Sequence, residues 1–252
     1  MQISGKKIVI TRPEPENQHS CLFYESLGAF PIAIPMMDIC PITDPQKKAA
    51  IQSKIFDIDL YDFVIFVSKN AVREAAKWLD RCWPMLPESI IWVGIGKGTT
   101  ALLQQEGIPA TTNSGQTTED LLTWSALSEL AHKKVLIIRG EGGRPTLAEI
   151  LEQRGAKVEY LNLYQRAPIN HPFDQLSSGD SANLILITSG EGLENLQASL
   201  AKHAKMWCDK TIITPSQRVA ELALRHGWQS VAQAPGADDN SMLQAIDCLQ
   251  DI

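Results

Sequence analysis

Runs of consecutive apolar residues alternate along the chain with segments in which apolar residues recur every three or four positions. Unbroken apolar runs are typical of parallel strands buried on both faces, and the spacing of three and four is typical of helices with one buried face. The pattern predicts strands at residues 6–11, 30–36, 62–67, 90–95, 133–138, 157–163, 183–188 and 210–214. It predicts helices at about residues 15–27, 70–79, 99–106, 145–154, 192–201 and 217–226. This alternation indicates an α/β fold with parallel sheets and right-handed crossovers.

The same pattern occurs twice along the chain. Residues 6–13 return at 133–140, an offset of 133 − 6 = 127. Residues 63–68 return at 184–189, an offset of 184 − 63 = 121, and residues 91–96 return at 211–216, an offset of 211 − 91 = 120. Self-similarity at a long period indicates duplicated structure.

The duplication by itself suggests a division near residue 130, but two linker-like segments suggest another. Residues 35–41 and 163–168 are extended in character, end in proline and are equivalent under the offset of 127. A chain that crosses between domains at both segments interlaces its two copies. We therefore predict an α/β fold with two similar flavodoxin-like domains, each a parallel sheet flanked by helices, joined by a two-stranded linker. The predicted bounds are 1–36 with 169–252 for domain 1, 42–163 for domain 2, and 37–41 with 164–168 for the linker strands.

Composition narrows the class of protein. The 252 residues suffice for two α/β domains, and no apolar run approaches the ~20 residues of a membrane helix. The N-terminus lacks a signal-peptide core, so a cytoplasmic protein without a membrane partner is expected. A net charge of −6 argues against nucleic-acid binding. Five scattered cysteines and five histidines without ligand spacing indicate reduced thiols and no metal site.

The candidate chemistry lies where the predicted strands end. Ligands of parallel sheets bind at the carboxyl ends of strands, where helix N-termini favour anions. Six such ends carry small, hydroxyl or basic residues, with Lys97 and Arg144 adding positive charge. If two domains present these ends to one ligand, that ligand is large and carries several separated negative groups. The candidate binding residues are Thr11, Arg12, Ser68, Lys69, Asn70, Gly96, Thr99, Arg139, Gly140, Thr188, Ser189, Gly190, Thr214 and Ser216. At any single junction, helix capping explains the same residue types equally well.

Other motifs are weak. The loop Gly94–Thr100 lacks the first glycine of a Walker A sequence, because Trp92 occupies that position, and a GxGxxG pattern fails at Thr99. The acidic groups at residues 57–62 and at 238–239 are interpreted as solvated caps, and the six tryptophans as packing residues.

Tyr164 is where the two copies differ in a way that suggests chemistry. It occupies the place of Met37, since 164 − 127 = 37. A tyrosine in a linker strand is expected to face the space between the domains, where its phenol could donate a proton. A packing residue with a hydrated hydroxyl is an equally good interpretation.

Taken together, these residues resemble the uroporphyrinogen-III synthase family over nearly the whole chain. The residues that carry the resemblance are 9–13 with 27–29, 66–72, 93–96 with Thr99, 139–140 with 143–144, 155–156 with 164–166, 188–190 with Leu196, and Ser216 with Arg218 and Ala220. Val67 departs from the pattern, because the family often has Thr before the Ser.

The resemblance implies a cofactor-free lyase of tetrapyrrole (haem) biosynthesis. Its substrate would be hydroxymethylbilane, a linear polyanionic tetrapyrrole that is closed to uroporphyrinogen III with loss of water and inversion of ring D. Tyr164 matches the family tyrosine proposed to assist departure of the hydroxyl. Residues 11, 68, 70, 99, 189 and 216 match binding positions. A monomer is expected, with transient contact to the preceding pathway enzyme as a further possibility.

Two other classes of function stay open. Duplicated α/β halves with crossing linkers also describe a bilobal binding protein that captures a small polyanion without turnover. A nucleotide-dependent enzyme rests on the incomplete loop at residues 94–99.

Overall fold

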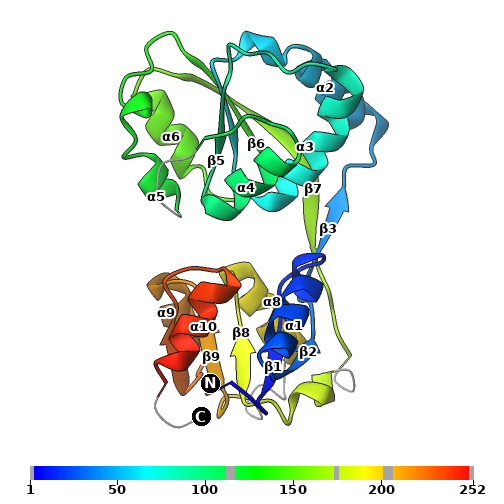
Figure 1. Cartoon of the computed structure of the whole chain (residues 1–252), viewed down its shortest axis with the longest axis vertical. Coiled ribbons are helices and arrows are strands. Elements are labelled where there is room, and N and C mark those ends of the chain that lie inside the picture. The colour runs from blue at the N-terminus through cyan, green and yellow to red at the C-terminus, as the bar shows by residue number, and fades with distance from the viewer. Residues whose placement is uncertain (1–2, 112–116, 173–175, 201–206, 250–252) are drawn as a thin grey trace. The chain divides into compact units, whose positions relative to one another are not determined.

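Contacts between residues divide the chain into two units (Figure 1). The computed structural model describes residues 3–111, 117–172, 176–200 and 207–249. Domain 1 comprises Met1–Asp38 and Ala167–Ile252, and domain 2 comprises Ile39–Arg166. Both junctions fall inside the segments expected as linker strands. The predicted α/β class, with parallel sheets flanked by helices, is confirmed.

Domain 1 holds a sheet in the order β2-β1-β8-β9-β10, in which each neighbouring pair is parallel. Numbered within the domain, this is the 2-1-3-4-5 order of flavodoxin-like folds. The strands are β1 (Lys7–Ile10), β2 (Phe30–Ala33), β8 (Leu184–Leu186), β9 (Thr211–Thr214) and β10 (Ser230–Gln233). The helices are α1 (Glu16–Ser26), α8 (Gly190–Leu200), α9 (Gln217–Arg225) and α10 (Asp239–Asp247).

Domain 2 holds a sheet in the order β3-β7-β6-β4-β5, in which β7, β6, β4 and β5 are parallel. Beyond β5, Thr111 forms a parallel bridge to Val93. The strands are β3 (Met37–Pro41), β4 (Phe63–Phe66), β5 (Ile91–Gly94), β6 (Lys134–Gly140) and β7 (Lys157–Pro168). The helices are α2 (Pro45–Phe56), α3 (Lys69–Cys82), α4 (Lys97–Gln105), α5 (Thr118–Leu121) and α6 (Thr146–Gln153).

The two sheets are equivalent under the sequence repeat. Strands β1 and β2 correspond to β6 and β7, and β4 and β5 correspond to β8 and β9. Even the bridge between Val93 and Thr111 has a counterpart, because Val93 corresponds to Ile213 (213 − 93 = 120), which pairs with Ala232 in β10. Each sheet therefore takes two strands from one copy and three from the other, so that neither copy forms a sheet by itself.

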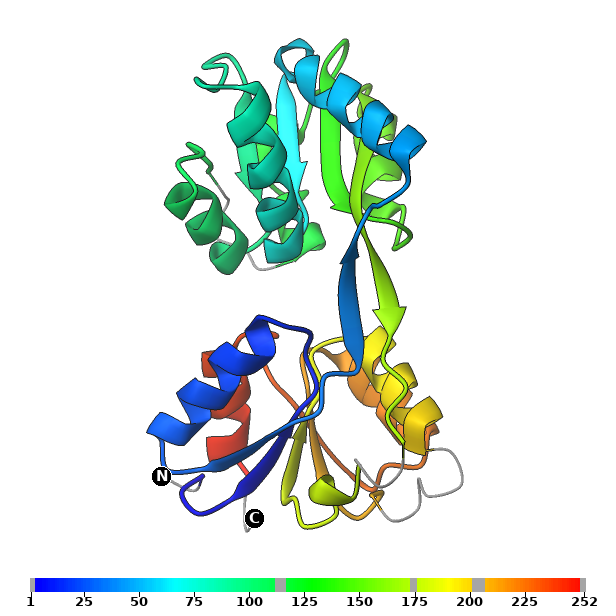
Figure 2. The ribbon, with the colours of Figure 1, turned by 90° about the vertical axis from the view of Figure 1, so that its right-hand side faces the viewer.

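The connection between the units differs from the sequence-based expectation in one respect. Strand β7 does not stop at residue 163 but runs unbroken to Pro168, with β3 as its neighbour (Figure 2). β3 lies beside this part of β7, and backbone bonds flank the paired segment at both ends, from Ile42 N to Leu163 O at 3.5 Å and from Ile169 N to Met36 O at 3.2 Å.

Among the described helices and strands, four were not predicted from the pattern: α2, α5, β10 and α10. Helix α2 has clear terminal signals, with Asp44 accepting from Lys47 N at 2.8 Å and Pro45 at the first turn. Its buried stripe, however, consists of Ile51 and Ile55. Strand β10 has no buried residue, because it lies at the edge of its sheet. Short stripes and edge strands carry little hydrophobic signal.

The core of each domain fills both faces of its sheet. All four residues of β4 are buried, as expected for a central parallel strand. The packing interpretation of the tryptophans is confirmed for Trp92, Trp207 and Trp228, which are fully or almost fully buried. Among the described residues, no helix is long and apolar enough to cross a membrane.

Candidate functional site

The parallel sheets bring the candidate residues together in two sets, one at the carboxyl edge of each sheet. In domain 1 the ends of β1, β8 and β9 and the residues that follow them include Thr11, Arg12, Thr188, Ser189, Gly190, Thr214 and Ser216. In domain 2 the end of β6 and the residues that follow β4 and β5 include Ser68, Lys69, Asn70, Gly96, Thr99, Arg139 and Gly140, with Tyr164 on β7. Whether these residues bind a ligand stays a prediction.

Tyr164 does not face away from its domain, so that expectation is wrong. Its side chain is 3% exposed and belongs to the core that includes Leu136 and Leu163. A register shift after Arg139 places Tyr164 opposite Gly140, and a Cβ on Gly140 would overlap the tyrosine ring. Gly140 therefore opens the space into which the ring packs.

The hydroxyl of Tyr164 reaches the beginning of α3. Ser68 is the N-cap of this helix, and its Oγ accepts a hydrogen bond from Ala71 N at 3.1 Å. The same Oγ lies 3.0 Å from Tyr164 Oη. The predicted catalytic phenol thus lies at a helix N-terminus, where the helix dipole favours negative charge.

Two lysines add positive charge at the same edge of domain 2. Lys69 and Lys97 are exposed, and each is the first residue of a helix, α3 and α4 respectively. Neither ammonium group has an ion-pair or hydrogen-bond partner within the part of the chain that the structure describes. A Cβ on Gly98 would lie 3.1 Å from Lys69 Cε, so the Lys69 side chain extends toward α4. The two cations are available to an anion.

The remaining candidates on these two loops have local structural partners. Asn70 Oδ1 accepts from Arg73 at 3.2 Å. Thr99 is buried, and Gly96 has a φ of 80°, which lets it precede α4 in a conformation that other residues disfavour.

The loop after β6 is held by Arg139. Its guanidinium lies 5.0 Å from the ring of Tyr160 and donates to Gly140 O at 3.2 Å and to Arg144 O at 3.3 Å. Glu141 in the same loop accepts from Lys47 at 2.6 Å and from Gln165 at 2.7 Å, and these bonds lower the pKa of Glu141. The loop therefore has a fixed shape, with Arg139 contacting carbonyl groups and an aromatic ring.

In domain 1 two of the candidate hydroxyls already have backbone partners. Thr11 Oγ1 donates to Leu186 O at 2.7 Å, and Thr214 Oγ1 donates to Ala232 O at 3.2 Å. Both side chains are buried. Each links its strand to the neighbouring strand at the carboxyl edge.

Ser189 repeats the cap seen at Ser68. Its Oγ accepts from Gly192 N at 3.0 Å. Ser216 precedes α9 without a side-chain cap bond, and Gly190 packs beside the guanidinium of Arg218. Thr188 is half-buried.

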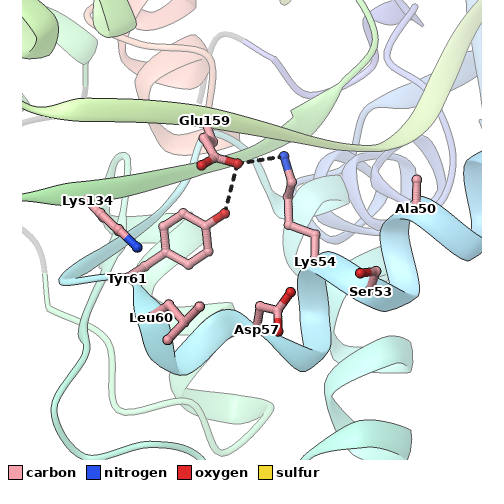
Figure 3. A pocket seen from close by; sticks show the side chains of 8 residues that line it. All are labelled: Ala50, Ser53, Lys54, Asp57, Leu60, Tyr61, Lys134 and Glu159. Atoms are coloured by element: carbon pink, nitrogen blue, oxygen red, sulfur yellow. Dashed lines mark hydrogen bonds and ion pairs between the residues drawn. The ribbon is translucent and has the colours of Figure 1, made fainter.

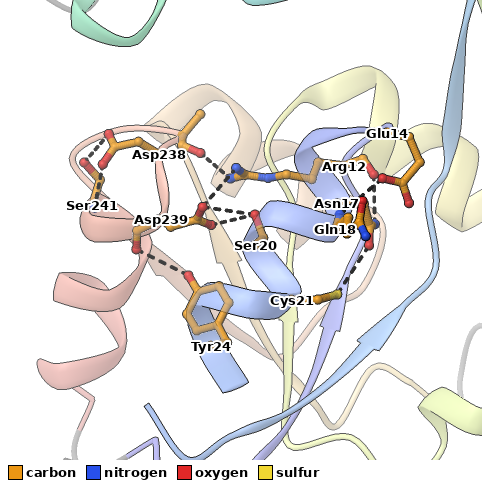
Figure 4. Close-up of polar contacts among 11 residues, drawn as sticks. Arg12, Glu14, Asn17, Gln18, Ser20, Cys21, Tyr24, Asp238, Asp239 and Ser241 are labelled. Atoms are coloured by element: carbon orange, nitrogen blue, oxygen red, sulfur yellow. Dashed lines mark hydrogen bonds and ion pairs between the residues drawn. The ribbon is translucent and has the colours of Figure 1, made fainter. Parts of the chain in front are cut away.

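Arg12 is tied to the beginning of α10 (Figure 4). Its Nη2 donates to Ala237 O at 2.6 Å, and its Nη1 lies 3.5 Å from Asp239 Oδ2. Asp239 also accepts from Ser20 Oγ, at 2.8 and 3.0 Å to its two oxygens. The Arg12 side chain is 10% exposed, so most of its charge faces this network.

Asp239 is the residue of this edge that sequence reasoning missed. The cap interpretation is confirmed for Asp238, which accepts from Ser241 N at 3.0 Å. It is wrong for Asp239, whose side chain is 20% exposed and pairs with Arg12. The two residues of the pair are 227 positions apart, so no local pattern could join them.

A separate hollow of about 340 Å³ lies at the opposite edge of domain 2, where the strands begin (Figure 3). Glu159 accepts there from Lys54 at 3.0 Å and from Tyr61 Oη at 3.1 Å. The Lys54 hydrogen bond is the main cause that lowers the pKa of Glu159, and burial together with the bond to Glu159 raises the pKa of Tyr61. The hollow contains none of the predicted site residues.

Comparison with known proteins gives one consistent result. The family model for uroporphyrinogen-III synthase HemD matches residues 20–244. The uroporphyrinogen-III synthase of Escherichia coli (strain K12) is 28% identical over 258 residues, which cover 95% of this chain and 99% of that protein. The enzyme of the same name from Proteus mirabilis is 31% identical over 176 residues, covering 68% of this chain and 85% of that protein.

Solved structures agree on the fold. A mutant uroporphyrinogen III synthase from Thermus thermophilus has a TM-score of 0.63 at 14% identity, covering 96% of this chain and 98% of that one. Uroporphyrinogen-III synthetase from Helicobacter pylori has a TM-score of 0.58 at 16% identity, covering 97% of this chain and 100% of that one.

Proposed function

The chain belongs to the uroporphyrinogen-III synthase family, and from this premise we propose that it closes hydroxymethylbilane to uroporphyrinogen III. The reaction loses water and inverts ring D, and the enzyme is a lyase that needs no cofactor. The observation that carries the proposal is the family match over residues 20–244. The two sets of strand ends, which suit a ligand with several separated carboxylates, support it.

Domain 2 offers the more available binding groups for those carboxylates. Lys69 and Lys97 are exposed cations without partners among the described residues, and both lie at helix N-termini. The unpaired backbone N–H groups at the N-termini of α3 and α4 favour an anion there, and so do the dipoles of the two helices. We propose that these groups bind substrate carboxylates, with the hydroxyl and backbone groups of the domain 1 edge contributing further contacts.

Tyr164 is proposed to donate the proton that turns the departing hydroxyl into water. The C–O bond of the hydroxymethyl group breaks, and its electron pair stays on the oxygen, which takes the phenolic proton. Ring closure at the substituted carbon of ring D gives a spiro intermediate, whose rearrangement and loss of a proton restore the phenol. Atoms therefore balance with water as the second product. Because this hydroxyl leaves readily, positioning of ring D contributes more to catalysis than proton donation.

The product isomer tests the proposal directly. Incubation with hydroxymethylbilane, followed by separation of the oxidised products, should give the type III isomer faster than the spontaneous reaction. Production of the type I isomer at the spontaneous rate, with the polyanion bound, would instead support a binding protein without turnover.

The role of Tyr164 has its own test. Tyr164→Phe should lower kcat about tenfold, a smaller decrease than the loss of a general acid usually causes. Type III should remain the main product. Tyr61→Phe is the matched control, because it removes a phenol oxygen from the opposite edge of the same domain. Its kcat should equal that of the native enzyme. A native kcat in Tyr164→Phe would reduce Tyr164 to a packing residue.

A further inference from the structure

The hydroxyl of Ser68 has two functions at once. Its oxygen accepts from Ala71 N at 3.1 Å, which caps α3, and it lies 3.0 Å from Tyr164 Oη. Each hydroxyl has one proton. When two hydroxyls are hydrogen-bonded to each other, one proton lies between the two oxygens and the other points elsewhere. Which proton lies between them decides whether the phenol can donate to another molecule.

The cap favours one of the two arrangements. Hydrogen bonds in a chain polarise one another, so a hydroxyl that accepts from a backbone N–H becomes a better donor. The chain Ala71 N–H to Ser68 Oγ–H to Tyr164 Oη runs in one direction. In this arrangement the phenolic proton of Tyr164 stays free.

The packing of the ring restricts where that proton can point. Tyr164 is 3% exposed, and Gly140 leaves the space for its ring without a Cβ. The ring plane is thus fixed by the core, and the contact with Ser68 fixes one side of the hydroxyl. The proton is left to the other side of the phenolic oxygen.

The duplicated structure provides a natural comparison. Ser189 corresponds to Ser68 under the offset of 121, and it caps α8 in the same way, through Gly192 N at 3.0 Å. The residue that corresponds to Tyr164 is Met37, which has no hydroxyl. The cap is common to both copies, whereas the contact with a phenol belongs to Ser68.

We propose that Ser68 is a positioning residue for Tyr164: it donates its proton to the phenolic oxygen, so that Tyr164 keeps its own proton for the substrate. The inference rests on the proposed function, in which Tyr164 is the proton donor. In this role Ser68 acts on catalysis through the hydroxyl of Tyr164. This role differs from the direct contact with substrate that the sequence predicts for Ser68.

A double-mutant cycle separates the two roles. Ser68→Ala should lower kcat about three- to tenfold, with KM within about twofold of native. In the Tyr164→Phe background the same substitution should have no further effect on kcat, because the hydroxyl on which Ser68 acts is gone. Equal losses in both backgrounds would overturn the proposal and indicate an independent contact of Ser68 with substrate.

Loss of the helix cap is controlled with two further variants. Ser189→Ala removes an equivalent cap, so its effect on kcat should be the same with and without Tyr164→Phe. Ser68→Thr keeps both the cap and the donor and should restore most of the native kcat. Failure of Ser68→Thr to exceed Ser68→Ala would contradict a role of the hydroxyl.

An activity-independent measurement distinguishes failure of this inference from failure of the proposed function. The chain has four tyrosines, and with ¹³C at Cζ the Tyr164 signal is assigned by its absence in Tyr164→Phe. Ser68→Ala should shift that signal, and Ser189→Ala should leave it in place. An unchanged Tyr164 signal in Ser68→Ala would overturn the contact itself. A shifted signal in a protein that forms no type III isomer would refute the proposed function instead.

Discussion

The carboxyl edges of the two sheets come from the same repeated sequence but use their polar residues differently. In domain 1, Arg12 faces Asp239 and the carbonyl of Ala237. In domain 2 its counterpart Arg139 contacts two carbonyls and a ring, with no carboxylate partner among the described residues. Domain 1 thus neutralises its arginine inside the domain, whereas domain 2 keeps unpaired positive charge at its edge.

The hydroxyl groups follow the same division. Thr11 and Thr214 in domain 1 donate to the backbone of neighbouring strands and are buried. In domain 2, Ser68 contacts another hydroxyl, that of Tyr164. Both domains therefore share the same arrangement of strand ends and helix N-termini. They differ in whether the polar groups there bond within the domain or remain available to a ligand. Substitutions at matched positions can test this difference.

The largest combined effect on stability and on kcat is expected at Gly140, which makes room for the ring of Tyr164 in domain 2. A methyl group there would overlap the buried Tyr164 ring, so Gly140→Ala should lower the free energy of unfolding by about 1–3 kcal/mol. It should also lower kcat at least as much as Tyr164→Phe. Denaturant unfolding and steady-state kinetics measure both. Gly98→Ala is the control, since its Cβ would meet the flexible end of Lys69, and it should not destabilise. Equal stability of the two variants would contradict the packing argument.

In domain 1 the corresponding test is Asp239→Ala. Removing a carboxylate that pairs with the largely buried Arg12 and accepts from Ser20 should cost about 1.5–3 kcal/mol of unfolding free energy. Asp238→Ala removes the α10 cap and should cost about 1 kcal/mol. Denaturant unfolding of the two variants side by side measures the difference. A cost for Asp239→Ala no larger than that for Asp238→Ala would mean that the Arg12 network contributes little.

The charge at the domain 2 edge is tested by replacing both free lysines. Lys69→Gln with Lys97→Gln should raise KM about three- to tenfold and leave stability unchanged, because exposed charges contribute little to folding. It should also weaken the dependence of KM on salt, since local cations outweigh the net charge of −6.

Lys133→Gln is the matched control for this pair. Lys133 lies at the opposite edge of the same sheet, 2.8 Å from Asp62, and its loss should leave KM as in the native enzyme. A native KM in the double variant would remove these lysines from the binding site.

The smallest effect concerns acid, and it is tested with one carboxyl group from each domain. Hydrogen bonding from Lys54 lowers the pKa of Glu159 in domain 2. In domain 1 burial acts to raise the pKa of Asp238, but hydrogen bonds from Ser241 and the charge of Arg12 contribute to a net lowering. A lowered folded-state pKa contributes stability above the unfolded value, about 4.3 for Glu, and this stability is lost as pH falls through the folded value.

Glu159→Gln should therefore reduce the loss of stability on acidification by less than about 1 kcal/mol, because this pair is partly exposed. Asp238→Asn keeps a capping oxygen and should act in the same direction. Unfolding free energies at pH 7 and pH 3 measure the effect. A variant that loses as much stability as the native protein between these pH values would assign acid sensitivity to other carboxyls.

The predictable part of the fold is the part that has a local cause. Strands β4 and β5 are unbroken apolar runs and β9 has two isoleucines between threonines, as buried parallel strands require, and the ends of all three were placed within one residue. Helix α2 was missed because it has only two buried residues, and strand β10 was missed because it has none. Their formation depends on neighbours that the local sequence does not show.

The candidate site divides in the same way. The positions of Ser68 and Ser189 before helices follow from the end of an apolar run and the start of a helical stripe. The direction in which the Tyr164 side chain points does not follow from the local sequence, because it depends on a register shift opposite Gly140. The partner of Arg12 does not either, because Asp239 comes from the other end of the chain.

By itself, the sequence determined the α/β class, the duplication and the positions of the strand ends, since each arises from a periodicity or a repeat within a short window. The tertiary structure decided which of those ends keep free charge. That decision depends on contacts such as Arg12 with Asp239 and Tyr164 with Ser68, between residues about 100 to 230 positions apart. Burial and pairing of a charge are properties of its surroundings, and those surroundings form when the two copies interlace.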